Sequence, residues 1–244
     1  MSELKAYPVW DAGTRWFHWI TVLCVIGLAG VGTAILFASD IGASDAGKVT
    51  LKTVHVYIGY VFALNLLWRF VWAFRGNRYA RWRAILPGGK GYFHSLRSYV
   101  NAFISGPPEN YLGHNPVGRI GVAVLLALIT IQAITGLLLA GTDLFFPPFG
   151  HWIAQWVAAP GIEPSALVPY SPDMYDSAAW DAMRALRSPV ITLHEISFYV
   201  LLVFIVAHIA GVVITEKREG GSLISAMFTG EKVMRREPVD KTHD

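Results

Sequence analysis

Residues 190–215 read VITLHEISFYVLLVFIVAHIAGVVIT. The run is long enough to cross a bilayer, which takes about 20 predominantly apolar residues in a helix. A helix is expected because lipid offers no hydrogen-bond partner to the backbone of an isolated strand. The run contains two histidines, His194 and His208. Ionisable side chains at membrane depth are rare and usually functional, so these two direct the rest of the interpretation.

Three further apolar runs cover residues 16–38, 53–74 and 119–141. Arg69, near the end of the second run, is expected to extend toward lipid head groups. Charged residues make up only 15% of the chain, against about a quarter in soluble domains. The sequence therefore predicts an all-α integral membrane protein, in which residues 1–244 form one domain around a four-helix transmembrane bundle. The net charge of +3 is too small to indicate nucleic-acid binding.

Lysine and arginine are concentrated in residues 1–15, 75–97 and 217–241. The positive-inside rule places such segments in the cytoplasm. We therefore expect both termini, including the tail 216–244, on the cytoplasmic side of a bacterial inner membrane. The connection 142–189 then lies in the periplasm.

This long connection contains two apolar-periodic pieces, at 149–157 and 178–186. Both are expected to form short helices on the outer membrane surface. They suit a lid over the bundle or a docking surface for a periplasmic redox partner, and the sequence favours neither.

His194 and His208 lie 14 residues apart, which in a helix is about 21 Å along the axis and about 40° short of four full turns. Both side chains therefore emerge on nearly the same face, at opposite depths. His18 opens the first span at the cytoplasmic side, level with His208. His55 opens the second span at the periplasmic side, level with His194.

Two facing pairs of neutral imidazoles suit two six-coordinate haem b groups in a bundle core. Covalent attachment is excluded because Cys24 is the only cysteine. A mononuclear transition-metal site is a weaker alternative, since no carboxylate or thiolate completes the ligand shell. Arg15, three positions before His18, and Arg69 are both suited to pair with haem propionates or lipid phosphates, and lipid anchoring is favoured for Arg69. Glycines within the spans admit either a macrocycle or close helix packing: Gly27, Gly30, Gly32, Gly59, Gly136 and Gly211.

Nearly the whole chain resembles the dihaem b-type cytochrome subunits of respiratory enzymes. The subunits of nickel–iron hydrogenases and the bacterial cytochrome b561 group are the most similar, and the gamma subunit of formate dehydrogenase shares the arrangement. The resemblance rests on Pro8-Val9-Trp10, Arg15-Trp16-Phe17-His18-Trp19, His55, Gly113-His114-Asn115-Pro116, the pair His194 and His208, and the tail Ser222-Leu223-Ile224-Ser225-Ala226-Met227-Phe228-Thr229-Gly230.

The resemblance implies electron transfer between a periplasmic partner, hydrogenase-like or a cytochrome c, and quinone in the membrane. It implies that His18 and His208 bind one haem, and His55 and His194 the other. It also implies a quinone site near His114 and Asn115, whose alternative role is a turn and cap ahead of Pro116.

Two other functions stay open at this point. The chain suits a self-sufficient b561-type oxidoreductase that passes electrons between quinol and a small oxidant such as superoxide. It also suits a small transporter or anchor with structural histidines, which would be colourless.

Overall fold

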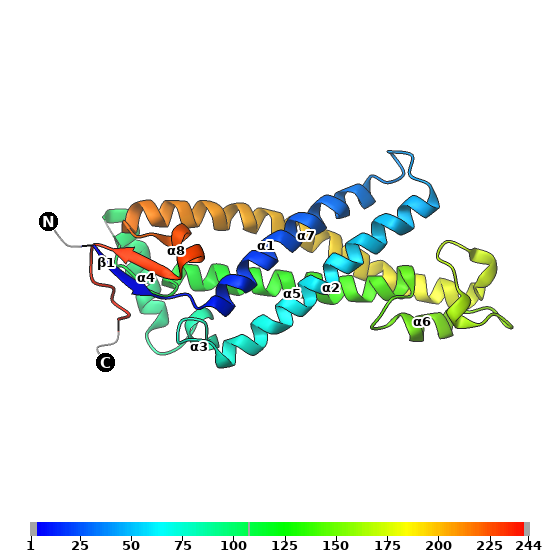
Figure 1. The fold of residues 1–244 in the computed structure, drawn as a ribbon, viewed down its shortest axis with the longest axis horizontal. Helices are drawn as coiled ribbons and strands as arrows, with labels where there is room; N and C mark the ends of the chain where they lie inside the picture. The colour runs from blue at the N-terminus through cyan, green and yellow to red at the C-terminus, as the bar shows by residue number, and fades with distance from the viewer. Residues whose placement is uncertain (1–3, 107, 242–244) are drawn as a thin grey trace. The chain divides into compact units, whose positions relative to one another are not determined.

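The computed structural model describes residues 4–106 and 108–241. Most of this part of the chain is helical (Figure 1). Four helices are long and apolar enough to cross a membrane, which confirms the four predicted spans. They are α1 (Ala12–Leu36), α2 (Asp45–Arg75), α5 (Pro116–Leu144) and α7 (Ser177–Glu219).

All four helices are longer than the apolar runs that predicted them. Hydropathy reports the part suited to hydrocarbon, whereas a helix continues as long as each residue adds a backbone hydrogen bond. The largest difference is in α7, which begins at Ser177 and contains Pro189. Residues 178–186 are therefore the first turns of α7, and the prediction of a separate surface helix there was wrong. The helix predicted at 149–157 is confirmed as α6 (Gly150–Val157).

Shorter elements fill the connections. α3 (Trp82–Ile85) and α4 (Tyr92–Ser105) lie between α2 and α5, and α8 (Leu223–Thr229) follows α7. Two single 3₁₀ turns, η1 (Pro164–Ala166) and η2 (Pro172–Met174), lie between α6 and α7. None of these short helices and 3₁₀ turns was predicted from the sequence.

A small sheet departs from the all-α prediction. β1 (Lys5–Pro8) pairs antiparallel with β2 (Glu231–Met234), with Lys5 opposite Met234 and Pro8 opposite Glu231 (Figure 1). Four-residue strands in polar termini carry too little alternation to be recognised in a sequence.

The turn into β2 requires glycine. Gly230 has a φ of 90°, and its carbonyl accepts hydrogen bonds from the N–H groups of Val9 and Trp10. A Cβ at Gly230 would lie 2.8 Å from the Trp10 carbonyl oxygen. Beside this turn, five buried residues form an apolar cluster: Val9, Trp10, Leu112, Ala226 and Met234.

The chain divides into two compact units, which we describe separately. The first unit comprises the described residues within 1–19, 66–128 and 200–244, and the second comprises 20–65 and 129–199. In both units the long helices expose large apolar side chains, such as Leu23 at 69% and Val206 at 68%. Such exposure suits lipid as the surrounding solvent.

Candidate functional site

The second unit brings His55 of α2 and His194 of α7 together. Their ring centroids lie 6.4 Å apart, with an angle of 75° between the ring planes. Glycines on the other two helices leave room for the rings. A Cβ at Gly32 of α1 would lie 3.2 Å from Cε1 of His55, and one at Gly136 of α5 would lie 3.4 Å from Cε1 of His194. Both glycines therefore allow a close approach of the helix to the imidazole.

Hydrogen bonds orient His194. Thr135 Oγ1 lies 2.7 Å from His194 Nδ1, and the same hydroxyl donates to the Ile131 carbonyl at 2.7 Å. Because a hydroxyl has one proton to donate, Oγ1 accepts from an Nδ1–H group. This assigns the tautomer that leaves the Nε2 lone pair free. Gln132 Nε2 also donates to the His194 carbonyl and to Ser197 Oγ, at 2.8 Å each.

An ionic network lies in the same unit. The carboxylate of Asp143, on α5, accepts from Lys52 at 2.5 Å and from Arg187 at 2.5 and 2.9 Å. Lys52 also lies 5.3 Å from the centre of the Tyr170 ring. The network joins α2, α5 and α7 through one largely buried carboxylate.

The other two histidines of the predicted spans, His18 of α1 and His208 of α7, both lie in the first unit, where the two rings interact electrostatically. The Trp19 ring meets His18 edge-on at 5.1 Å, and its Nε1 donates to the Met227 carbonyl at 3.0 Å. The buried Nδ1 of His18 has no hydrogen-bond partner within residues 4–106 and 108–241.

The two arginines singled out in the sequence are both in the first unit. Arg15 donates from Nη1 to the Phe228 carbonyl, and its buried Nε has no hydrogen-bond partner among the described residues. Arg69 is only 4% exposed, donates to the Ala80 carbonyl at 3.0 Å and lies 5.7 Å from the Phe17 ring centre. The expectation that Arg69 anchors the helix to lipid was therefore wrong, because the guanidinium is directed into the protein.

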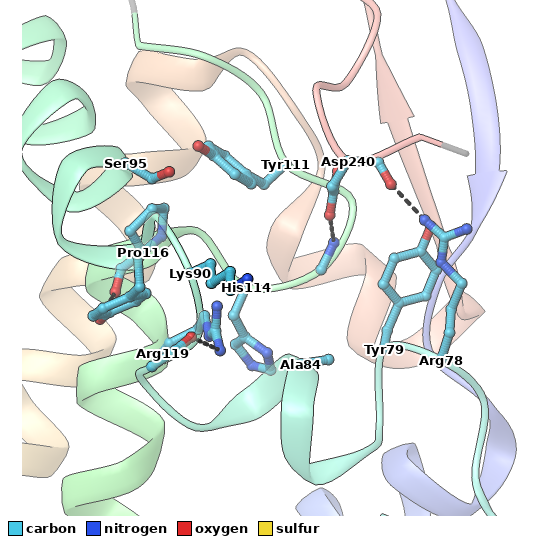
Figure 2. A pocket seen from close by; sticks show the side chains of 13 residues that line it. Arg78, Tyr79, Ala84, Lys90, Ser95, Tyr111, His114, Pro116, Arg119 and Asp240 are labelled. Carbon is cyan, nitrogen blue, oxygen red and sulfur yellow. Dashed lines mark hydrogen bonds between the residues drawn. The ribbon is translucent and has the colours of Figure 1, made fainter. Parts of the chain in front are cut away.

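A cavity of about 320 Å³ opens beside His114 in the first unit (Figure 2). The His114 ring lies 4.9 Å from that of Trp10. The buried Nδ1 of His114 has no hydrogen-bond partner among the described residues. Burial, with smaller contributions from nearby cations such as Lys232 and Arg69, lowers the pKa of His114 to about 3. The imidazole is therefore neutral at physiological pH. The cavity is lined by Arg78, Tyr79, Ala84, Gly88, Lys90, Tyr92, Ser95, Tyr111, Gly113, His114, Pro116, Arg119 and Asp240.

Asn115 is occupied by protein contacts. Its Oδ1 accepts from the Gly118 N–H at 2.7 Å, which caps the start of α5. Its Nδ2 donates to the Tyr99 hydroxyl at 2.7 Å and to Glu219 Oε1 at 3.1 Å. An amide has two N–H donors, and both are used. The predicted role of Asn115 as a helix cap is therefore confirmed. Of the two residues predicted near a quinone site, only His114 has a side-chain nitrogen without a described partner.

Comparison with known proteins agrees with these features. A family model described as prokaryotic cytochrome b561 matches residues 9–230. Relatives named "Probable Ni/Fe-hydrogenase B-type cytochrome subunit" include one from Cupriavidus necator, 23% identical over 96% of this chain and 90% of the relative. One from Rhizobium leguminosarum bv. viciae is 27% identical over 96% of this chain and 91% of its own.

A third relative, from Escherichia coli K12, is named "Probable Ni/Fe-hydrogenase 1 B-type cytochrome subunit" and is 29% identical over 62% of this chain and 68% of its own. No solved structure matches the chain. The match to the family model extends over most of the chain, from the turn before α1 to the turn before β2. The protein therefore belongs to the prokaryotic cytochrome b561 family.

Proposed function

We propose that this protein is the membrane subunit that carries electrons between a nickel–iron hydrogenase and the quinone pool. Its family makes it a b-type cytochrome, a multi-pass membrane protein that holds haem b and serves electron transport. The relatives named as hydrogenase cytochrome subunits support the choice of partner. When bound, haem b supplies reversible one-electron chemistry at its iron.

His55 and His194 are the proposed axial ligands of one haem, and their separation is the observation that carries the proposal. Two imidazoles that would hold one haem between them have to come from facing positions and to stand further apart than two rings in contact. The observed separation is 6.4 Å. Thr135 directs Nδ1–H of His194 to itself, as an outer partner of a metal-bound histidine does.

His18 and His208 are the proposed ligands of a second haem. They lie in one unit on the same two helices, α1 and α7, that the depth argument pairs. The unpaired Nδ1 of His18 and the unpaired Nε of Arg15 are buried polar atoms without a described partner. An unpaired buried donor such as Arg15 Nε is costly in a protein interior, and a haem propionate would supply an acceptor for it.

The cavity beside His114 is the proposed quinone site. A quinone takes up two electrons and two protons to become quinol, so its oxygens change from acceptors to donors. A neutral imidazole has one N–H donor and one lone pair, which suits both forms. Since both donors of Asn115 are used, its proposed role is to hold the start of α5 beside His114.

The charge distribution supports an inner-membrane orientation with both termini in the cytoplasm. The connection between α2 and α5, which carries His114, then lies on the cytoplasmic side, and the connection between α5 and α7, which carries α6, lies on the periplasmic side. The proposal therefore places quinone chemistry in the cytoplasmic half and partner docking in the periplasmic half.

A kinetic experiment tests the quinone site. The purified protein is reduced with stoichiometric dithionite, and its reoxidation by decylubiquinone is followed in the Soret band. His114→Phe is expected to slow reoxidation by about 100-fold, the scale of a lost proton-transfer group, with the haem content unchanged. His94→Phe, at an exposed position of α4 in the same unit, serves as the control. Reoxidation at the wild-type rate in His114→Phe would remove the quinone from this cavity.

The partner needs a separate measurement. Hydrogen gas is expected to reduce the b haem in native membranes, and membranes that lack the hydrogenase large subunit should lose that reduction. Reduction that persists without the hydrogenase would assign the periplasmic partner to another class, such as a cytochrome c.

A further inference from the structure

The segment that carries His114 is held by the end of the chain. We call residues 110–115 the His114 loop and residues 231–240 the C-terminal clamp. Lys232 Nζ donates to the carbonyls of Tyr111 at 3.1 Å and Gly113 at 3.0 Å. Lys232, in the C-terminal clamp, therefore binds the backbone carbonyls on both sides of Leu112.

Asp240 binds the backbone N–H groups of the same loop. Its carboxylate accepts from Leu112 N at 2.6 Å and Gly113 N at 2.9 Å. Next to it, Val239 N donates to the Asn110 carbonyl at 2.9 Å. Figure 2 shows Asp240 against the loop at the edge of the cavity, with Arg78 donating to its carbonyl. Four consecutive residues of the loop are thus bound by three residues of the clamp.

Lys232 is an unusual group for this task. It is only 2% exposed, and it forms no ion pair in the described part of the chain. Its ammonium lies 5.5 Å from the Trp10 ring centre, and Trp10 packs against His114. A buried ammonium bound only to carbonyls costs much of its hydration energy. Such a group is poorly suited to a general stability role, and its contacts all concern the surroundings of His114.

We propose that Lys232 and Asp240 are positioning residues for the His114 site, and that the C-terminal clamp thereby sets the affinity of the cavity for quinone. The inference rests on the proposed function of His114 as the quinone-binding side chain. The clamp begins just beyond residues 9–230, where the match to the family model ends. The family assignment therefore says nothing about it.

Titration of Lys232 agrees with this role. Burial lowers its pKa to about 8, although Glu219 and Asp240 partly offset the effect. The other ionisable group next to it is His114, which is neutral. Above pH 8 the loop loses charge-assisted hydrogen bonds, which are about twice as strong as neutral ones.

The experiment uses the full-length protein with its haem bound. Lys232→Met removes the hydrogen bonds to the loop carbonyls, and Asp240→Ala removes those from the loop N–H groups. Lys241→Met is the matched control, because Lys241 is in the same tail but forms its ion pair with Glu237 on the surface and lies 5.9 Å from the Tyr7 ring centre, with no contact to the His114 loop among the described residues. For each variant the haem content is measured first, and then the KM and kcat of reoxidation by decylubiquinone.

Both test variants are expected to raise KM between about 10- and 100-fold, the effect of misplacing a binding group by an ångström, with kcat and haem content near wild type. The KM of the wild type should also rise above pH 8, and Lys232→Met should lose this dependence. If Lys232→Met fails to fold, Asp240→Ala carries the test through its own contacts.

The possible failures are distinguishable. Wild-type KM in both clamp variants, with His114→Phe impaired, would overturn the clamp and leave the quinone site standing. Wild-type kinetics in His114→Phe would overturn the quinone site and the clamp with it. A parallel loss of haem and activity in both clamp variants would show a structural role only, and would also overturn the inference.

Discussion

The two histidine pairs have contrasting surroundings. His55 and His194 lie in a unit where Thr135 orients one of the rings and an ionic network joins α2, α5 and α7. His18 and His208 share their unit with a cavity, a polar loop and the clamp from the chain's end. A site whose helices are joined by ionic contacts suits the transfer of electrons alone, because little rearrangement accompanies it. A unit that contains a cavity suits chemistry in which protons and an exchangeable molecule take part.

The largest expected effect is the loss of haem when one histidine of either pair is replaced. His55→Ala and His18→Ala should each lose one haem, since a six-coordinate haem needs both axial ligands. The first variant should still be oxidised by decylubiquinone, whereas the second should not. Difference spectra and the pyridine haemochrome assay measure the haem, and stopped-flow absorbance measures the oxidation. Loss of quinone reactivity in both variants would contradict the assignment of quinone chemistry to the His18 and His208 pair alone.

A second prediction concerns how rigidly the unit around His55 is held. Asp143→Asn leaves Lys52 and Arg187 as partly buried cations with no carboxylate between them. Breaking such a pair typically costs 3–5 kcal/mol when fully buried, and we expect about 3 kcal/mol here. Thermal melting followed in the Soret band measures the loss.

The control for this variant is Asp45→Asn. Asp45 pairs with Lys48 while 70% of its side chain is exposed, so its loss should cost less than about 1 kcal/mol. Equal effects of the two substitutions would show that the Asp143 network does not stabilise the unit.

A third prediction sharpens the comparison through pH. Burial lowers the pKa of Lys232 from its ordinary value of 10.5 to about 8 in the folded protein. Between these values the unfolded chain binds more protons, so the free energy of unfolding rises with pH through that window. The gain relative to Lys232→Met is at most about 3 kcal/mol. Melting at pH 7.5 and pH 10 measures it, and a difference that stays constant would contradict a buried charged lysine.

The smallest expected effect is electronic. Thr135→Val removes the acceptor for Nδ1–H of His194, so the imidazole donates less charge and the ferrous state becomes relatively more stable. Loss of a hydrogen bond of about 1 kcal/mol corresponds to roughly 40 mV for a one-electron couple. We expect the midpoint potential of one haem to rise by that amount in a spectroelectrochemical titration. A shift of the other haem instead would reverse the assignment of the pairs.

The long apolar helices, and the placing of His194 and His208 on one of them, could be predicted from the sequence because both depend on local patterns. An apolar run of 20 residues has one stable solution in lipid, and the 14-residue spacing between His194 and His208 survives in the single helix α7. The sequence could not tell whether the glycines in the spans make room for a cofactor or for close helix packing. In the structure, Gly32 lies against the His55 ring and Gly136 against the His194 ring.

The parts that could not be predicted depend on contacts between distant segments. Lys232 belongs to a polar stretch that is typical of a solvated tail, yet it is buried against a loop more than a hundred residues earlier. Arg69 had the position of a lipid anchor, and only the neighbouring Ala80 carbonyl and Phe17 ring show that it faces inward. Residues 178–186 had the periodicity of a surface helix, which is also the periodicity of the first turns of a long one.

Haem stoichiometry tests the central claim most directly. The protein is purified in detergent after expression with an adequate haem supply, and haem b per chain is measured by the pyridine haemochrome assay. Two low-spin haems per chain are predicted, one for each histidine pair. A single haem per chain would contradict the account, because one of the two pairs would then be a packing feature rather than a cofactor site.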